Sequence, residues 1–200
     1  MLCDLGMSRV LRHKPWLRKR AAHRKVFRRG IDLGQARPDA AARMKEMKLR
    51  EGDAAPGFTA PTNGGGEVSL SQFRGQAVVL YFYPKDSTPG CTTEAQDFRD
   101  RVKDFEQTGA VILGASKDSV KRHDNFKAKQ SIPFALVSDE EGTLCDAYGV
   151  WIQKKLYGRE YMGIERATFL IDAKGIIREI WHKVKVKGHA DAVLDAVKTL

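Results

Sequence analysis

The chain has little cysteine and no long apolar run. Its 200 residues contain three cysteines, Cys3, Cys91 and Cys145, which are too few and too far apart for a disulfide scaffold or a zinc site. Free thiols are typical of a reducing compartment, so we expect a cytoplasmic protein. No stretch reaches the roughly 18 consecutive apolar residues of a membrane-spanning helix. We expect neither a membrane partner nor a bound metal or cofactor.

Acidic residues are scarce in one part of the chain only. Residues 1–46 contain 13 Lys and Arg against 4 Asp and Glu, whereas the rest of the chain contains 22 against 21. The net charge of +10 therefore belongs mainly to the first 46 residues. A segment this charged buries too little apolar surface to offset the entropy cost of ordering. We expect residues 1–46 to be a basic extension, disordered or an isolated helix, and residues 47–200 to form one folded domain.

One stretch of the domain combines a buried strand, a turn and a helix that begins with a thiol. The apolar run Val78–Tyr83 predicts a buried strand, a Pro/Ser/Thr/Gly cluster breaks it, and a helical pattern follows. Thr88 suits the N-cap and Pro89 the first helical position, so Cys91 falls in the first turn. Unpaired N–H groups and the helix dipole favour an anion there, and thiolate is the attacking form of cysteine. Cys91 is therefore a candidate nucleophile, the alternative being a buried structural thiol.

The same stretch carries a family resemblance. The spacing Pro84-x-x-x-Thr88-x-x-Cys91 resembles the peroxidatic motif of the peroxiredoxins, and FYPKDSTPGCTTEA is similar to the group called bacterioferritin comigratory protein or peroxiredoxin Q. The similarity extends from near Leu49 to the C-terminus. It implies that Cys91 attacks the peroxide, that Thr88 hydrogen-bonds thiolate and peroxide, and that Pro84 shields the thiolate from water. Arg166, in GIERATFLID, matches the family's active-site arginine.

Arg166 also fits this chemistry by its own properties. It precedes the apolar run Ala167–Ile171, so a permanent cation stands at the start of a predicted strand. Its fork of N–H donors suits a thiolate and a peroxide oxygen together. The alternative is a solvated arginine at a strand end. The resemblance, rather than the spacing, implies that Arg166 lies beside Cys91.

Strands and helices alternate along the rest of the domain. Ala110–Ala115 predicts a second buried strand and Phe134–Val137 another, with a helix between them from Ser119 to Gln130. Ala167–Ile171 and Ile176–Trp181 flank an Asp-Ala-Lys-Gly turn and are predicted to pair as a hairpin. This alternation predicts an α/β domain with a central mixed β-sheet flanked by helices. This set of strands and helices is typical of a thioredoxin-like fold, which the resemblance also implies.

Two details complete the predicted secondary structure. The helix after the thiol carries one apolar stripe, formed by Ala95, Phe98, Val102 and Phe105, and so is predicted to continue through all four positions. Val150-Trp151 is predicted to be extended chain.

The resemblance implies a thiol-dependent peroxidase. The thiolate attacks one oxygen of hydrogen peroxide or an organic hydroperoxide, water or an alcohol leaves, and Cys91 becomes a sulfenic acid that has to be reduced. Many relatives have a resolving cysteine five residues later, where this chain has Gln96. Within the chain only Cys145 or Cys3 is left as a resolving cysteine, and Cys145 matches a position that relatives often fill with a non-resolving one. We expect an external reductant, namely thioredoxin, glutaredoxin or a low-molecular-weight thiol, and a monomer.

Alternative functions come from other classes. A thiol–disulfide oxidoreductase of the same fold would carry C-x-x-C, but Thr92-Thr93-Glu94 follows the thiol. A metal site is not expected, because the histidines have no ligand spacing with cysteines or carboxylates. A non-enzymatic domain tethered to nucleic acid or anionic membrane would use the basic extension, although we expect no nucleic-acid partner.

Three interpretations of the extension stay open. It is basic and acid-poor like an organellar targeting peptide, but Ser8 is its only serine, which departs from that pattern. Trp16 and Phe27 lie among cations, as in a nucleic-acid or lipid-binding arm. The third interpretation is that the natural chain begins at Met44 or Met47, because the family-like sequence starts just after them.

Overall fold

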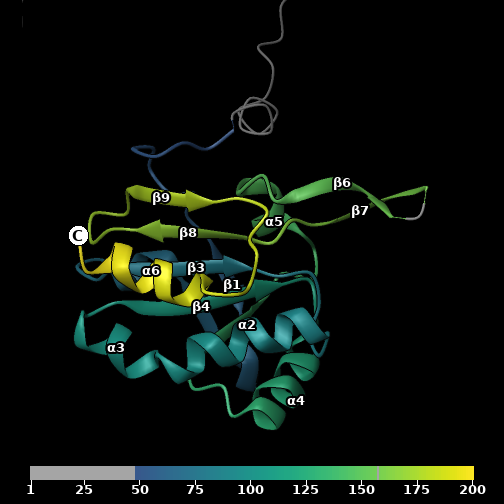
Figure 1. Ribbon diagram of the computed structural model, residues 1–200, viewed down its shortest axis with the longest axis horizontal. Helices are drawn as coiled ribbons and strands as arrows, with labels where there is room; N and C mark the ends of the chain where they lie inside the picture. The colour runs from purple at the N-terminus through teal and green to yellow at the C-terminus, as the bar shows by residue number, and fades with distance from the viewer. Residues whose placement is uncertain (1–47, 157) are drawn as a thin grey trace, which may run out of the picture. The chain divides into compact units, whose positions relative to one another are not determined.

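A five-stranded mixed sheet lies at the centre of the domain in the computed structural model, which describes residues 48–156 and 158–200 (Figure 1). The strands, in their order across the sheet, are β5 (Ala135–Ser138), β4 (Val111–Ser116), β3 (Val78–Phe82), β8 (Ala167–Ile171) and β9 (Ile177–Trp181). β3, β4 and β5 are parallel, whereas β8 runs antiparallel to β3 and to β9. The predicted strands and the β8–β9 hairpin are confirmed. Residues 1–46, with Cys3 and the three interpretations of the extension, lie outside the described residues.

Both faces of the sheet are covered, which explains why β3 is apolar at every position. Successive side chains of a strand point to opposite faces. Val79 and Tyr81 join one core cluster, and Val78, Leu80 and Phe82 join the other. The first cluster packs under four helices, α2 (Pro89–Asp100), α3 (Val102–Gln107), α4 (Val120–Gln130) and α6 (His189–Val197). The second packs under α5 (Thr143–Ala147) and the hairpin of β1 (Thr59–Pro61) and β2 (Glu67–Ser69). The prediction of a mixed sheet flanked by helices is confirmed.

Two predicted details differ from the structure. The predicted continuous helix after the thiol is interrupted at Arg101 (φ −108°, ψ 5°), where α2 ends and α3 begins. Phe98 and Phe105 still belong to the same core, as the apolar stripe predicted, and the Arg101 side chain at the break pairs with Asp191 of α6. The chain after Val150 forms a complete antiparallel hairpin, β6 (Trp151–Leu156) and β7 (Arg159–Ile164), of which the sequence indicated only the first residues.

The beginning of the domain contacts both outer strands of the sheet. Ala54 pairs with Ile176 just before β9, and Thr62 pairs with Val137 in β5. Between these two points lies β1, and after Thr62 come the short 3-10 helices η1 (Asn63–Gly65) and, beyond β2, η2 (Leu70–Phe73). One run of chain therefore reaches from one edge of the sheet to the other.

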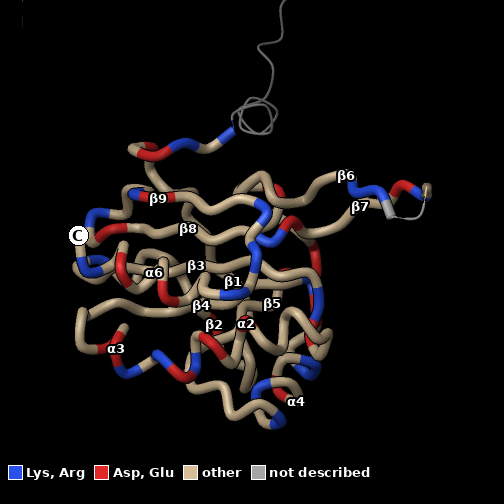
Figure 2. Tube along the Cα trace, viewed as in Figure 1, with Lys and Arg blue, Asp and Glu red and all other residues tan. Residues whose placement is uncertain are grey.

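Charged residues of both signs are interspersed along the described chain (Figure 2). Both signs occur on α2, on α3 and at the tip of the β6–β7 hairpin, whereas α4 is mostly basic and α6 carries acidic residues only. No helix of the described residues is both long enough and apolar enough to span a bilayer.

Candidate active site

Cys91 lies in the first turn of α2, directly after the loop that leaves the carboxyl end of β3. Thr88 is the N-cap residue in an extended conformation (φ −85°, ψ 151°), and Pro89 occupies the first helical turn. The predicted helix start is therefore confirmed. Cys91 is only 1% exposed and belongs to the core cluster beneath α2.

Arg166 contacts the sulfur of Cys91. Its Nη2 donates to Cys91 Sγ at 3.2 Å, although the two residues are 75 positions apart. The sheet explains this proximity, because Ala167 of β8 is the antiparallel partner of Phe82, the last residue of β3. Burial by itself lowers the pKa of Arg166, but the negative charges of Glu94 and Cys91 outweigh it and the net shift is upward. A permanent cation is thus held at the thiol.

Glu94 is a member of the site that the sequence analysis missed. It is 1% exposed, and it forms an ion pair with Nη1 of Arg166, while the other nitrogen of the same fork faces Cys91. Burial raises the pKa of Glu94 from 4.5 to about 7, although the guanidinium of Arg166 opposes the shift. Its Oε1 atom is buried without a hydrogen-bond partner. The signal was its position three residues after Cys91, which places both on one helix face.

Thr88 and Pro84 lie on the same strand–loop–helix segment as Cys91. The Thr88 hydroxyl donates its proton to the carbonyl of Lys85 at 3.1 Å. The lone pairs of its oxygen remain available to accept a hydrogen bond from another group. Pro84 is exposed in the wall of a cavity of about 610 Å³, together with Lys85 and Trp151. Neither residue makes a hydrogen bond to Cys91 in the structure, in contrast to Arg166.

Cys145 lies in a different environment. It belongs to the core on the other face of the sheet, beneath α5, whereas Cys91 belongs to the core beneath α2. Burial, together with the negative charge of Asp139, raises the pKa of the Cys145 thiol. Both cysteines are free. The structure therefore does not place Cys145, the possible resolving thiol, beside Cys91.

A thiol at a helix N-terminus, faced by an arginine from the neighbouring strand of a thioredoxin-like sheet, defines a thiol-dependent redox enzyme. The sequence profile of the AhpC/TSA family matches residues 51–180, and the chain belongs to this family. Within it the chain is similar to "Putative peroxiredoxin bcp" of Coxiella burnetii, with 51% identity over 74% of this chain and 98% of that protein. It is 49% identical to "Peroxiredoxin Bcp" of Bacillus subtilis, over 77% of this chain and 98% of that protein.

Solved structures agree with these relatives. Peroxiredoxin Q of Xanthomonas campestris is 51% identical and superposes with a TM-score of 0.69 over 71% of this chain and 90% of that chain. Another structure of the bacterioferritin comigratory protein of X. campestris is described in terms of its alkyl peroxide reduction activity. The resemblance to the peroxiredoxin Q group and the thioredoxin-like fold are thereby confirmed, and the protein is a thiol-dependent peroxidase. The alternatives of a thiol–disulfide oxidoreductase and of a tethered domain are not favoured.

Proposed function

We propose that Cys91 is the nucleophile of this peroxidase and that it reduces hydrogen peroxide and organic hydroperoxides to water and alcohols. The observation that carries the proposal is the 3.2 Å contact between Arg166 Nη2 and Cys91 Sγ in the first turn of α2. A guanidinium at this distance stabilises the thiolate and can also donate to a peroxide oxygen bound beside it.

The reaction follows from this arrangement. The thiolate attacks the hydroxyl oxygen of the hydroperoxide, an S–O bond forms as the O–O bond breaks, and Cys91 becomes a sulfenic acid. The departing oxygen carries the negative charge and takes up a proton to leave as water or alcohol. Arg166 stabilises the charge as it moves along this axis. Thr88 accepts a hydrogen bond from the attacked O–H group, because its own proton points to Lys85.

Glu94 and Pro84 have supporting roles in this proposal. Glu94 holds one side of the Arg166 fork, which leaves the other side directed at the sulfur. Pro84 has no N–H group to hydrate and keeps water from one side of the loop.

We further propose that an external thiol reduces the sulfenic acid, because Cys145 lies in the opposite core with a raised pKa. The first thiol attacks the sulfur of the Cys91 sulfenic acid, which loses its oxygen as water, and a mixed disulfide forms. A second thiol then attacks this disulfide and regenerates the Cys91 thiol. Thioredoxin, glutaredoxin or a low-molecular-weight thiol fits this step. Residues 47–200 of a single chain carry the whole site, so a monomer suffices and the extension 1–46 is not needed for the chemistry. The two free thiols agree with a cytoplasmic setting.

The test is an intact-mass measurement on fully reduced protein after one equivalent of hydrogen peroxide, with and without a dimedone trap for sulfenic acid. A dimedone adduct on Cys91 without a disulfide is the expected result. Loss of two hydrogens and a peptide that links Cys91 to Cys145 would refute direct reduction of the sulfenic acid by an external thiol. No rapid change at Cys91 would refute its role as nucleophile. Cys91→Ser serves as the negative control, and Cys145→Ser should behave as the wild type.

A further inference from the structure

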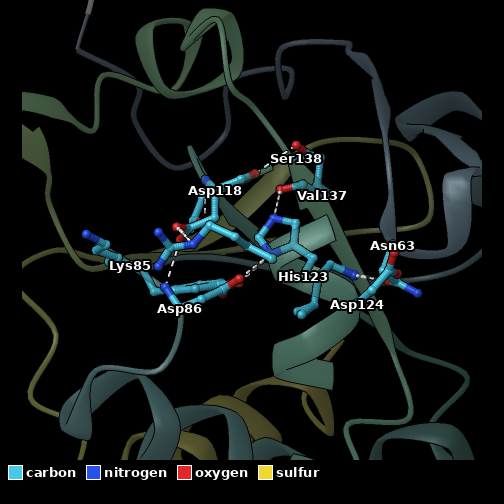
Figure 3. Close-up of polar contacts among 12 residues, drawn as sticks. Asn63, Lys85, Asp86, Asp118, His123, Asp124, Val137 and Ser138 are labelled. Carbon is cyan, nitrogen blue, oxygen red and sulfur yellow. Dashed lines mark hydrogen bonds and ion pairs between the residues drawn. The ribbon is translucent and has the colours of Figure 1, made fainter. Parts of the chain in front are cut away.

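A buried polar network lies behind the loop that connects β3 to the active-site helix (Figure 3). Its centre is Asp86, 3% exposed in the loop, and His123, 0% exposed in the first turns of α4. Asp86 Oδ2 lies 2.8 Å from His123 Nδ1, and Asp86 Oδ1 accepts a hydrogen bond of 2.7 Å from the Tyr83 hydroxyl. The other ring nitrogen, His123 Nε2, lies 3.1 Å from the carbonyl oxygen of Val137 in β5.

Both ring nitrogens of His123 have buried partners. Both ring nitrogens face acceptors, one a carboxylate and the other a backbone carbonyl. A neutral imidazole has only one N–H donor, whereas the doubly protonated ring donates to both acceptors. In that form His123 and Asp86 are a buried ion pair. Such pairs contribute little net stability, because desolvation of the two charges offsets their attraction. A role in fixing the loop therefore accounts for a charged pair at this position better than a contribution to stability does.

The loop that Asp86 holds has a conformation that needs support. The backbone N–H of Asp86 donates to Asp118 Oδ2 at 2.7 Å, and the same oxygen accepts from Ser116 at 2.9 Å. The next residue, Ser87, has a φ of 60°, in the left-handed region that a side chain makes unfavourable. The contacts of Asp86 with His123, Tyr83 and Asp118 support this conformation, so removal of the ion pair takes away part of that support.

The loop in turn orients the Thr88 hydroxyl. The carbonyl that accepts the Thr88 proton belongs to Lys85, the residue before Asp86. An acceptor for this proton turns the lone pairs of the hydroxyl toward other partners. A continuous series of contacts therefore connects His123 on α4 and Val137 on β5 with Asp86. The loop from Lys85 then connects Asp86 with the Thr88 hydroxyl at the start of α2.

We propose that the ion pair of Asp86 and His123 positions the Thr88 hydroxyl for the peroxide, acting through the loop 85–88. Asp86 and His123 are positioning residues, because neither contacts Cys91 or Arg166. This inference rests on the proposed function of Cys91, and it assigns to a histidine on α4 an effect on the rate of peroxide reduction.

The test compares two reactions of the Cys91 thiol, measured separately in each variant. One is the second-order rate constant with hydrogen peroxide by stopped flow, which depends on the orientation of the peroxide. The other is the rate of alkylation by iodoacetamide, which depends on the thiolate and its accessibility but needs no peroxide. A purely structural role changes both rates together or neither. A positioning role changes the first only.

The informative variants are His123→Leu and the double variant Asp86→Ala/His123→Leu. The single change leaves a buried carboxylate without its cation, so it also lowers stability. The double change removes both charges, and apolar replacement of a buried pair is often neutral for folding. We expect about a tenfold or greater loss of the peroxide rate in both, with alkylation within about twofold of the wild type. Asp86→Asn keeps an oxygen acceptor for His123 and should lose less than Asp86→Ala.

The outcomes are distinguishable. A peroxide rate of the double variant equal to that of the wild type, or an equal loss of both rates, would overturn the proposal. Detection of a single ring proton on His123 by ¹⁵N NMR would overturn the ion pair on which it depends. Val197→Ala is the matched control, because it removes buried methyl groups from α6, away from the network, and should lower stability without lowering the peroxide rate. If the wild type itself forms no sulfenic acid at Cys91, the proposed function fails instead.

Discussion

Replacement of Glu94 by glutamine should remove a pH dependence from the free energy of unfolding. Burial raises the pKa of Glu94 from 4.5 to about 7, so the folded protein holds this proton more tightly than the unfolded chain does. The stability that the group contributes is therefore complete below pH 4.5 and is lost as the pH rises to about 7. At about 1.4 kcal/mol per pKa unit, the loss over this window is about 3 kcal/mol.

Glutamine has the same shape and no proton to release, so the variant lacks this loss. We expect the difference in the free energy of unfolding between wild type and Glu94→Gln to change by about 3 kcal/mol from about pH 4 to about pH 8, with the wild type losing stability relative to the variant. Urea titrations across this range measure both proteins, and their difference cancels the titration of every other group. Glu106→Gln, an exposed position on α3, is the control and should follow the wild type at every pH. Parallel curves for wild type and Glu94→Gln would refute the raised pKa.

Three further predictions concern the site and the core. Arg166→Gln removes a preorganised donor from Cys91 and should slow the reaction with hydrogen peroxide by about 10²- to 10³-fold in stopped flow; a rate close to that of the wild type would contradict the proposed role of the arginine. Cys145→Ser should leave steady-state peroxide turnover with an external thiol unchanged, and a large loss of recycling would show that this thiol resolves. Gly114→Ala should lower the free energy of unfolding by about 1–3 kcal/mol in urea titrations, because a Cβ there would lie 2.7 Å from the Tyr81 ring; an unchanged midpoint would mean that the core adjusts.

Local chemistry made the start of the active-site helix predictable. Thr88 and Pro89 suit the first positions of a helix, so the placement of Cys91 followed from neighbouring residues alone. The contact between Cys91 and Arg166 depends instead on the pairing of β3 with β8. Hydrophobic periodicity identifies strands but does not say which strands pair, so only the family resemblance indicated this contact.

Buried charges were the part of the site that the sequence did not reveal. Polar side chains on a helix are usually solvated, and Glu94 and His123 lie inside because partners from other elements accept or balance their charge. The β6–β7 hairpin escaped prediction for the opposite reason. Most of the side chains described on β7 are exposed, so its residues show no apolar alternation from which a strand is predicted.

The run of chain from Ala54 to Thr62 has a consequence for the behaviour of the protein in solution. The outer strands of an open sheet present unpaired backbone groups to which a second molecule can add its own strand. Here the same short run pairs beside β9 at one border of the sheet and with β5 at the other. Proteolysis within this run would release both pairings at once and favour association between molecules.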